Sequence, residues 1–453
     1  MNTNHQRMTL LATSISYVIV ILDTSIVNVA LAKISQELGT NVTGLQWIVN
    51  AYVVTFASLL LSGGALGDVF GARRIYIAGL AIFSVASLLC GCAPTMGILI
   101  AGRVLQGIGA SLLVPCSLSL LTHAYPDGRE RAKAIAAWAS WGGGALVAGP
   151  LAGGLLLQFF DWSSIFLMNV PFTLVGIWLT LRTDKQVSDH GARRLDIAGQ
   201  GTAALAITLL TAALIEVSRL GIHHLWIRSA LAIAMLSAVA FVLIERRTRS
   251  PMLPLFLFSN PSFSTISYMF LSGSAAFFGM LFVMGLYFQE SVGYTPLQTG
   301  IALLPLSICV LAGNVVSGRL LHLIAPMHQM LIGAVIRLVG FVGLVFVDVD
   351  FPYPVIAVLL ALVGFGGGLG APMSTSVFMS SVDKPYTGIA SGISRATAQI
   401  GSALGVAIFG AFIGNPHDMV SGTKLAALCA AVLTGSIIVT NCYLLRQRTS
   451  MAC

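Results

Sequence analysis

The sequence GIGASLLVPCSLS, Gly107 to Ser119, returns in altered form as GFGGGLGAPMSTS, Gly364 to Ser376. Glycines, the proline and two serines coincide in the two stretches. Two further pairs match at nearly the same spacing: GALGDVFGARR from Gly64 with GRLLHLIAPMH from Gly318, and ALVAGPLAGG from Ala145 with GSALGVAIFG from Gly401. The offsets are 257, 254 and 256 residues. Three matches in the same order predict that the chain contains two diverged copies of one repeat.

Apolar runs surround these stretches, each long enough to cross a hydrocarbon layer of about 30 Å as a helix. Of the 453 residues, 57% are hydrophobic and 9% are charged, whereas soluble domains carry roughly 25% charged residues. We therefore predict an all-α integral membrane fold with fourteen transmembrane helices. The spans are expected near 9–31, 46–66, 75–93, 97–122, 134–158, 162–181, 195–217, 225–244, 262–289, 298–320, 328–347, 353–378, 388–413 and 424–445.

The repeat and the spans together predict the organisation of the chain. Residues 1–182 are expected to form a six-helix bundle and residues 251–453 a second one. Residues 183–250 are expected to form an inserted linker pair of helices between them. Parallel halves related by an axis along the membrane normal are typical of one large class of transporters.

The net charge of +8 is distributed unevenly along the chain. With the N-terminus in the cytoplasm, seventeen Lys and Arg residues fall on the cytoplasmic side of the predicted spans and four on the opposite side. This bias follows the positive-inside rule. We therefore expect a multi-pass protein of the plasma (cytoplasmic, or inner) membrane with both termini in the cytoplasm. The charge needs no nucleic-acid partner to explain it.

Asp23 lies near the middle of the first predicted span, within LDTSIVNVALA, Leu22 to Ala32. A lone carboxylate is costly to keep ionised in hydrocarbon, so it is expected to take up a proton more readily than in water. This favours a role for Asp23 in carrying protons. The competing interpretation is a hydrogen bond to a neighbouring helix that serves packing alone.

GALGDVFGARR connects the second and third predicted spans. Gly64 and Gly71 permit a tight turn, because glycine adopts conformations closed to other residues. Asp68 can cap a helix or pair with a cation, and Arg73 and Arg74 can bind carboxylates or lipid phosphate. We interpret these five residues as a conformational latch. The alternative is a charged loop that only sets topology.

RVLQGIGASLLVP places Arg103 inside the fourth predicted span. A guanidinium in hydrocarbon needs a partner, and Arg103 could hold a proton-titrating carboxylate ionised until the substrate or a conformational change intervenes. A static contact with backbone carbonyls would also use arginine, because of its forked donors. Glu290, near an outer span end, is a secondary candidate for proton coupling, although it could equally be solvated there. Arg337 and Arg395 are further cations in predicted spans.

AGPLAGG, Ala148 to Gly154, combines glycines with a proline in the fifth predicted span. Gly149, Gly153 and Gly154 let helices approach closely, and Pro150 removes one backbone hydrogen bond and bends the span. A hinge or gate would use these residues. Close packing alone would use the same ones.

Together these motifs resemble those of the major facilitator superfamily, and specifically its fourteen-helix drug:proton antiporter family of the methylenomycin-resistance type. LDTSIVNVALA is similar to the first-helix motif, with Ala32 where proline is usual. GALGDVFGARR is similar to the cytoplasmic signature, with Val69 and Ala72 at two positions that are often basic. RRLDIAG, 193–199, resembles the entry into the inserted pair, and SGISRATAQIGSALG, 391–405, resembles the thirteenth helix.

The resemblance covers almost the whole chain and implies a proton-coupled antiporter. Its expected cargo is small amphiphilic or apolar drugs or antibiotics, exported from the cytoplasm, with no cofactor and no metal. The export direction rests mainly on the likeness of AGPLAGG to the antiporter motif of helix five. Its expected partners are a small-molecule substrate, protons and membrane lipid, and we expect a monomer.

The side chains expected to line a substrate cavity are aromatic residues and amides of the predicted spans. They are Asn28, Trp47, Asn50, Tyr52, Gln106, Trp138, Trp141, Tyr287 and Gln289. An amphiphilic drug suits such a surface, although any single aromatic could instead contact lipid or serve packing. A nutrient importer or metabolite exporter of the same fold remains an alternative, but a polar solute would need more hydrogen-bonding partners.

Motifs of other functional classes are missing from the sequence. GIGASL and GFGGGLG neither follow a strand nor open an amphipathic helix, which argues against nucleotide binding. The chain has no Walker-type GK[ST], no G-x-S-x-G and no Cys or His pair with metal-ligand spacing, so we predict no enzyme. A non-transporting receptor or scaffold would need large loops, and the longest connections are under about twenty residues.

Overall fold

The computed structural model describes residues 3–183, 196–248, 251–383, 386–414 and 419–452, all of whose regular structure is helical. In chain order the helices are α1 (Thr3–Leu38), α2 (Val42–Phe70), α3 (Ala72–Gly91), α4 (Met96–Ala124), α5 (Gly128–Phe159), α6 (Ser164–Leu167), α7 (Asn169–Leu181), α8 (Ile197–Leu220), α9 (Leu225–Arg247), the 3-10 helix η1 (Leu255–Ser259), α10 (Pro261–Leu286), the π-helix η2 (Tyr287–Ser291), α11 (Pro296–Ala302), α12 (Leu304–Leu320), α13 (Pro326–Leu344), α14 (Tyr353–Ser380), α15 (Thr387–Phe412) and α16 (Met419–Ala452). The start of RRLDIAG, residues 193–195, lies outside the described residues.

Thirteen helical segments of the described chain are long and apolar enough to cross a membrane. They coincide with thirteen of the fourteen predicted spans. The remaining predicted span, 388–413, is the 26-residue helix α15. It is long enough to cross, but Arg395 and several Ser and Thr residues make its first half more polar than the other spans. The predicted all-α membrane fold is confirmed.

Several helices extend beyond the predicted spans because their first turns are polar and capped. The α5 helix begins at Gly128, where the Asp127 side chain accepts hydrogen bonds from the backbone N–H groups of Arg129 and Glu130. Hydropathy detects only the apolar part of such a helix. Capping side chains satisfy backbone donors that would otherwise have no partner at the helix start.

Two predicted spans are each built from two α-helices. The span near 162–181 breaks at Met168, between α6 and α7, and the span near 298–320 breaks at Leu303, between α11 and α12. Pro171 and Pro305 follow the two breaks by a few residues. Proline lacks the N–H that would bond to the preceding turn, so each helix restarts at that point.

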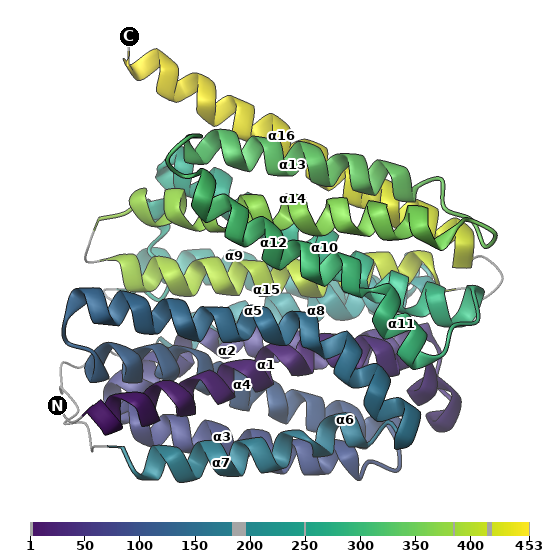
Figure 1. The fold of residues 1–453 in the computed structure, drawn as a ribbon, viewed down its shortest axis with the longest axis horizontal. Helices are drawn as coiled ribbons and strands as arrows, with labels where there is room; N and C mark the ends of the chain where they lie inside the picture. The colour runs from purple at the N-terminus through teal and green to yellow at the C-terminus, as the bar shows by residue number, and fades with distance from the viewer. Residues whose placement is uncertain (1–2, 184–195, 249–250, 384–385, 415–418, 453) are drawn as a thin grey trace. The chain divides into compact units, whose positions relative to one another are not determined.

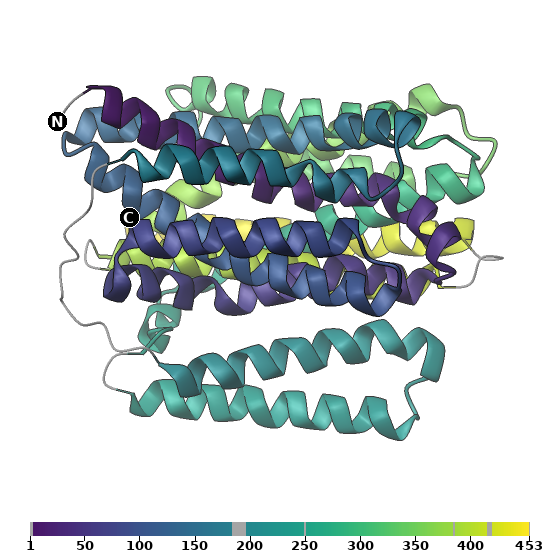
Figure 2. The ribbon, with the colours of Figure 1, turned by 90° about the horizontal axis from the view of Figure 1, so that it is seen from below.

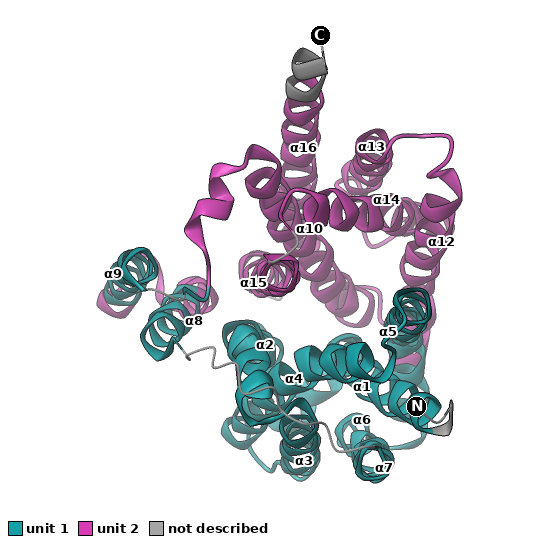
Figure 3. Cartoon of the chain, turned by 90° about the vertical axis from the view of Figure 1, so that its left-hand side faces the viewer, with its two compact units in different colours: residues 1–210, 229–252 teal, residues 211–228, 253–453 magenta. Residues whose placement is uncertain are grey.

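The chain forms two compact units, shown in different colours in Figure 3. Unit 1 is Met1–Leu210 with Ser229–Met252, and unit 2 is Thr211–Arg228 with Leu253–Cys453. Unit 1 therefore contains the first six predicted spans, and unit 2 contains the last six. The residues of α8 and α9, expected as a separate linker pair, are divided between the two units.

The same pattern of helix packing recurs in the two units. In unit 1, α4 packs against α2 and α3, and α1 packs against α5. In unit 2, α14 packs against α12 and α13, and α10 packs against α15. Within each unit the long helices run roughly along a common axis (Figure 1). The packing follows the sequence repeat, because α4 and α14 carry its two best-matched stretches.

Glycines of the repeat make these close helix contacts. A Cβ atom on Gly107 of α4 would lie 2.7 Å from the Tyr52 carbonyl oxygen of α2, and one on Gly109 would lie 3.0 Å from the Gly79 carbonyl oxygen of α3. In unit 2, Gly364 of α14 lies against the Leu306 carbonyl of α12. Backbones that meet this closely leave no room for larger side chains.

In unit 1, the first part of α8 and most of α9 run alongside each other (Figure 2). Gln200 of α8 attaches this pair to α2 by two hydrogen bonds. Its amide donates to the Ser58 carbonyl, and its Oε1 accepts from the Ser62 hydroxyl at 2.5 Å. The inserted helices are therefore joined to the bundle of unit 1 by a specific polar contact near the start of α8.

Candidate functional site

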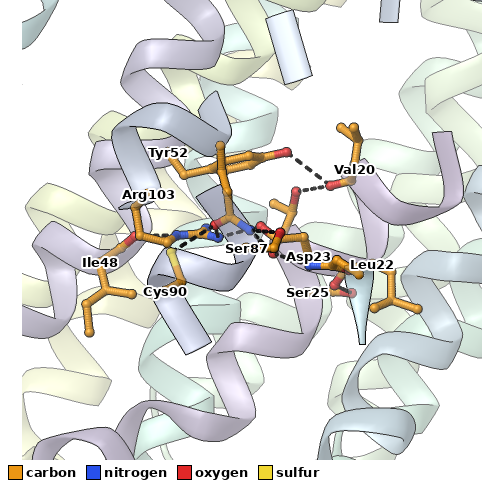
Figure 4. Close-up of polar contacts among 12 residues, drawn as sticks. Val20, Leu22, Asp23, Ser25, Ile48, Tyr52, Ser87, Cys90 and Arg103 are labelled. Carbon is orange, nitrogen blue, oxygen red and sulfur yellow. Dashed lines mark hydrogen bonds and ion pairs between the residues drawn. The ribbon is translucent and has the colours of Figure 1, made fainter. Parts of the chain in front are cut away.

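A buried ion pair joins α1 to α4 inside unit 1 (Figure 4). The Nη1 atom of Arg103 lies 2.5 Å from Oδ2 of Asp23. The side chains of Asp23 and Arg103 are 0% and 1% exposed, so both charges are removed from solvent. The structure thus brings together two of the three residues that the sequence nominated for proton coupling, although they are 80 residues apart.

The other faces of the Arg103 guanidinium are also occupied. Its Nε donates to the Ile48 carbonyl of α2 at 3.0 Å. Its Cζ atom lies 4.4 Å from the ring centroid of Tyr52, and 5.7 Å from that of Phe166. Aromatic faces attract cations, most strongly where water is excluded. Arg103 is therefore held in one position by three different helices besides its own.

The second carboxylate oxygen of Asp23 is bonded more weakly. Its Oδ1 accepts from Nε2 of Gln106 at 3.3 Å and from Nδ2 of Asn169 at 3.2 Å. Gln106 is itself fixed at both ends, because its Oε1 accepts from Arg103 at 2.7 Å and its Nε2 donates to the Ser87 hydroxyl at 2.9 Å. Gln106 and Tyr52, which the sequence predicts to line the substrate cavity, belong to this network around Asp23 and Arg103.

Local structure explains how these side chains converge. Arg103 and Gln106 are three residues apart on α4, so they lie on the same helical face. Asn169 is the first residue of α7, directly after the break at Met168. The Tyr52 hydroxyl donates to the Val20 carbonyl at 3.2 Å, which ties α2 to α1 one turn before Asp23.

Asn169 and Ser87 are functional candidates that the sequence reasoning missed. Asn169 is 1% exposed and Ser87 is fully buried. The available signal was a polar amide in the otherwise apolar segment that precedes Pro171. Buried polar side chains in membrane spans need partners, and only the packing of α7 against α1 shows which partner Asn169 has.

The ion pair is neutral overall but costly to disturb. Two opposite charges in a low-dielectric interior attract strongly, and removing one partner of such a pair typically destabilises a protein by about 3–5 kcal/mol. A proton on Asp23 has the same effect on charge as removing the carboxylate. A protonated Asp23 would therefore leave Arg103 as a buried cation without its counter-ion.

The predicted latch residues lie where α2 meets α3. Gly71 has φ 92°, which links the two helices in a conformation that favours glycine. Arg73 donates to the carbonyls of Thr180 and Leu181, at the end of α7. The side chains of Asp68 and Arg74 are exposed, and Gly64 packs against Pro115 of α4. The latch function stays a prediction.

The predicted hinge residues lie at the contact between α5 and α1. Gly149 packs against Ser25, and a Cβ atom on Gly153 would lie 2.8 Å from the side chain of Ile26. Pro150 is inside α5, and Gly154 is buried. These contacts lie two and three residues beyond Asp23 on α1. A bend in α5 would therefore displace the part of α1 next to the ion pair.

The predicted cavity residues of unit 1 lie in different surroundings. Trp138 is 1% exposed, stacks on Tyr17 with ring centroids 3.8 Å apart, and donates to the Thr13 carbonyl. Asn28 donates to the Thr24 carbonyl within α1. Trp47 is half-buried, and Trp141 is exposed. The structure does not bring these side chains to a single site.

Asn50 differs from the other predicted cavity residues. Its side chain is 0% exposed, yet neither its Nδ2 nor its Oδ1 has a hydrogen-bond partner. An unsatisfied buried amide costs about 1–3 kcal/mol. Such groups call for an explanation, and a hydrogen-bonding group on a bound molecule would supply the missing partner.

The candidate residues of unit 2 lie around the π-helix η2. The Tyr287 hydroxyl donates to the Asp348 carbonyl at 2.8 Å, and Gln289 donates to the Gly285 carbonyl. Glu290 is exposed. Arg395 of α15 is half-buried. The structure therefore places Glu290 outside the buried interior, unlike Asp23.

These observations define a polytopic helical membrane protein with a buried ion pair among its spans. The chain belongs to the Major Facilitator Superfamily, whose family profile matches residues 13–406. It is 36% identical over 420 residues to a methylenomycin A resistance protein of Bacillus subtilis, which covers 92% of this chain and 90% of that protein. It is 35% identical over 428 residues to a methylenomycin A resistance protein of Streptomyces coelicolor, with 94% and 89% covered.

Two further comparisons agree with this assignment. A cephamycin export protein of Amycolatopsis lactamdurans is 33% identical over 442 residues, covering 92% of this chain and 90% of that protein. The solved structure of the nucleoside transporter NupG superposes with a TM-score of 0.68 at 12% identity, covering 96% of this chain and 99% of that one. At that identity the likeness concerns the fold alone. The chain is thus a multi-pass membrane transporter of small molecules rather than an enzyme.

Proposed function

We propose that this transporter exports small amphiphilic or apolar drugs or antibiotics from the cytoplasm in exchange for protons. The observation that carries the proposal is the buried Asp23–Arg103 ion pair, a proton-accepting group enclosed by membrane-spanning helices. The names of its relatives, which are resistance and export proteins, support the export direction and the class of cargo.

In the proposed cycle, protonation of Asp23 breaks the ion pair. The carboxyl group then carries no charge, so the attraction that holds α1 to α4 weakens, and every remaining partner of Arg103 is neutral. A ligand or proton shifts a conformational equilibrium only if it binds the two states with different affinity. Asp23 meets this condition, because Arg103 favours its ionised form in the conformation described here.

The proposed substrate class follows from the surroundings of the polar network. The helices of unit 1 contribute aromatic and aliphatic side chains, and Asn50 contributes an amide without a partner. A molecule with an apolar body and one or two hydrogen-bonding groups matches this composition. Asn50 is proposed to bind such a group.

The latch and hinge are proposed to transmit the charge change. Arg73 binds the end of α7, and the first residue of α7 contacts Asp23. A shift of α7 caused by the charge change at Asp23 would therefore also move the partner of Arg73. Gly149 and Gly153 allow α5 to slide on α1 without side-chain clashes. Glu290 is proposed only as a secondary proton site, because it is exposed.

We further propose that the protein works as a monomer in the plasma membrane, in contact with lipid, with both termini in the cytoplasm. The proposed topology rests on the distribution of Lys and Arg between the connections. A reporter fused after Leu445 should be cytoplasmic, and one inserted between Gly221 and His224 should be outside. The opposite labelling would contradict this topology.

Proton flux in vesicles containing the purified protein tests the proposed function. Addition of a substrate drug should release or take up protons in wild-type vesicles, and an imposed pH gradient should drive uphill drug movement. Asp23→Asn should abolish both signals, because asparagine keeps the size of the side chain but cannot titrate. Drug binding should remain measurable.

A matched variant serves as the control for this experiment. Asp350→Asn changes an exposed carboxyl of unit 2 in the same way and should retain gradient-driven efflux. If Asp23→Asn protein reaches the membrane and still couples uphill efflux to proton flux, the proton site lies elsewhere. Drug movement without any proton flux in the wild type would reject antiport.

A further inference from the structure

The inference concerns Asn169, and it rests on the proposed proton coupling at Asp23. We propose that Asp23 takes up its proton on Oδ1, and that the Asn169 amide then rotates to accept a hydrogen bond from the new hydroxyl. Asn169 is therefore a positioning residue that serves both protonation states. No sequence motif that we identified includes this residue.

The two oxygens of Asp23 differ in how easily they can be protonated. Oδ2 accepts a charge-assisted bond from Arg103 at 2.5 Å, and a proton on this oxygen would face that cation directly. Oδ1 accepts only two neutral amide bonds, at 3.2 Å and 3.3 Å. The proton therefore adds at the lower cost to Oδ1, and Oδ2 keeps its contact with Arg103.

A protonated Oδ1 carries an O–H group that needs an acceptor. In the conformation described, both neighbours of Oδ1 present N–H donors to it, as an ionised carboxylate requires. A donor facing a hydroxyl hydrogen leaves a buried O–H unsatisfied, which is unfavourable in a dry interior. One of the two amides must therefore reverse for the protonated state to be stable.

Gln106 cannot reverse without losing other bonds. Its Oε1 accepts from Arg103 at 2.7 Å, and its Nε2 donates to Ser87 at 2.9 Å. Rotation would point the amide N–H₂ group at the guanidinium, donor against donor. Gln106 is thus fixed in the orientation that favours the ionised carboxylate.

Asn169 has the freedom that Gln106 lacks. Its Oδ1 is buried and has no hydrogen-bond partner. Rotation of the amide by half a turn exchanges this unpaired oxygen for Nδ2, so the number of hydrogen bonds made by Asn169 is the same before and after. In one orientation Nδ2 donates to the carboxylate; in the other Oδ1 accepts from the carboxyl O–H.

The charges around Asp23 are compatible with this switch. Arg103 of α4 is the charged group in contact with it, and the titratable groups of Tyr52 from α2 and Cys90 from α3 also face the pair. The Tyr52 hydroxyl donates to Val20, and the Cys90 thiol points at Gln106 and Leu99. None of these groups offers Asp23 the free acceptor that Asn169 does.

Infrared difference spectroscopy of the protein in membranes tests the proposal. The carbonyl stretch of protonated Asp23 is assigned as the acid band that Asp23→Asn removes. In Asn169→Leu this band should move to higher frequency, because its O–H has lost its acceptor. Efflux should fall roughly two- to tenfold, the change expected for one buried hydrogen bond.

A matched control separates this effect from the general loss of a buried amide. Asn441 of α16 in unit 2 is likewise buried, with one amide donor bond, to the Met327 carbonyl, and an unpaired Oδ1. Asn441→Leu should leave the Asp23 band in place. Asn169→Ala, which only removes atoms, repeats the test if the leucine variant does not fold.

The possible outcomes are distinguishable. An Asp23 band at the same frequency in wild type and in both Asn169 variants would overturn the amide switch, because Asn169 would then act only as a donor to the ionised form. Absence of any acid band that depends on Asp23 would instead reject proton coupling at Asp23 itself.

Discussion

The α4 helix of unit 1 and the α14 helix of unit 2 share their packing but differ in chemistry. Both place glycines against the backbones of two neighbouring helices, and both contain an internal proline. The offset of 257 residues that aligns them places Leu360 and Val363 where α4 has Arg103 and Gln106. Both residues of α14 are buried, at 1% and 2% exposure. The helix packing is therefore the same in the two halves of the repeat, whereas Arg103 and Gln106 of the polar network have apolar counterparts in unit 2.

Unit 2 also contains a buried arginine, but of a different kind. Arg337 of α13 donates to the Gly273 carbonyl of α10 at 2.6 Å, and its Nε has no partner. Among the described residues it has no carboxylate within ion-pair distance. It therefore differs from Arg103, which contacts the Asp23 carboxylate.

The largest effect on transport and stability is expected when Arg103 of α4 is replaced by leucine, the residue at the matching position of α14. Arg103→Leu should abolish uphill efflux and lower stability by about 3–5 kcal/mol, because Asp23 is left buried without its counter-ion. The double variant Asp23→Leu with Arg103→Leu should recover most of that stability but no transport. Thermal unfolding in detergent and efflux from vesicles measure the two effects.

Arg337→Leu is the matched change in unit 2. It removes a buried charge that has no ionised partner, so stability should stay the same or rise, and proton-coupled efflux should persist. A loss of coupling as complete as in Arg103→Leu would erase the distinction between the two arginines.

A smaller effect on stability should distinguish the glycines of α4 from those of α14. A Cβ atom on Gly366 would lie 2.6 Å from the backbone nitrogen of Arg337, whereas one on Gly109 meets its neighbours at 3.0 Å. Alanine gains roughly 0.5–1 kcal/mol over glycine inside a helix. Gly109→Ala should therefore be nearly neutral, and Gly366→Ala should cost about 1–3 kcal/mol through overpacking. Equal melting temperatures for the two variants would show that the two interfaces are equally tolerant.

The smallest effect is expected at an ion pair on the surface of unit 2. Lys424 and Asp348 lie 2.8 Å apart, and Asp348 is 62% exposed. The hydrogen bond from Lys424 lowers the pKa of the Asp348 carboxyl. The stabilisation is therefore present above the ordinary carboxyl pKa and is lost as the pH falls through the lowered pKa.

Asp348→Asn tests this contrast with the buried pair. Solvent screens an exposed pair, so the variant should unfold within a few degrees of the wild type at neutral pH and transport at the normal rate. The small difference in melting temperature should begin to shrink below about pH 4 and should vanish below the lowered pKa of Asp348. A difference that grows on acidification would have the wrong sign for a carboxylate with a lowered pKa.

The sequence predicted the spans well because hydrophobic length is a local property. It also nominated Asp23, Arg103 and Gln106, since charged and amide side chains in apolar runs stand out. Which of them touch one another could not be predicted, because Asp23 and Asn169 are 146 residues apart and meet only through helix packing. The break at Met168, which sets the position of Asn169, depends on Pro171 within an apolar run that reads as one continuous span.

The close glycine contacts of α4 and α14 also limit how far the sequences of the two halves can diverge. At Gly107 and Gly364 a new side chain meets backbone, which has no alternative rotamer and cannot yield. At position 103 the side chain meets mainly other side chains, among them those of Asp23, Gln106 and Tyr52, which can repack or be exchanged in pairs. Substitutions at 103 and 360 should therefore disturb the close approach of the helix backbones less than substitutions at 107 and 364. A duplicated chain can in this way acquire or lose a charged centre in one half while the shape of both halves is preserved.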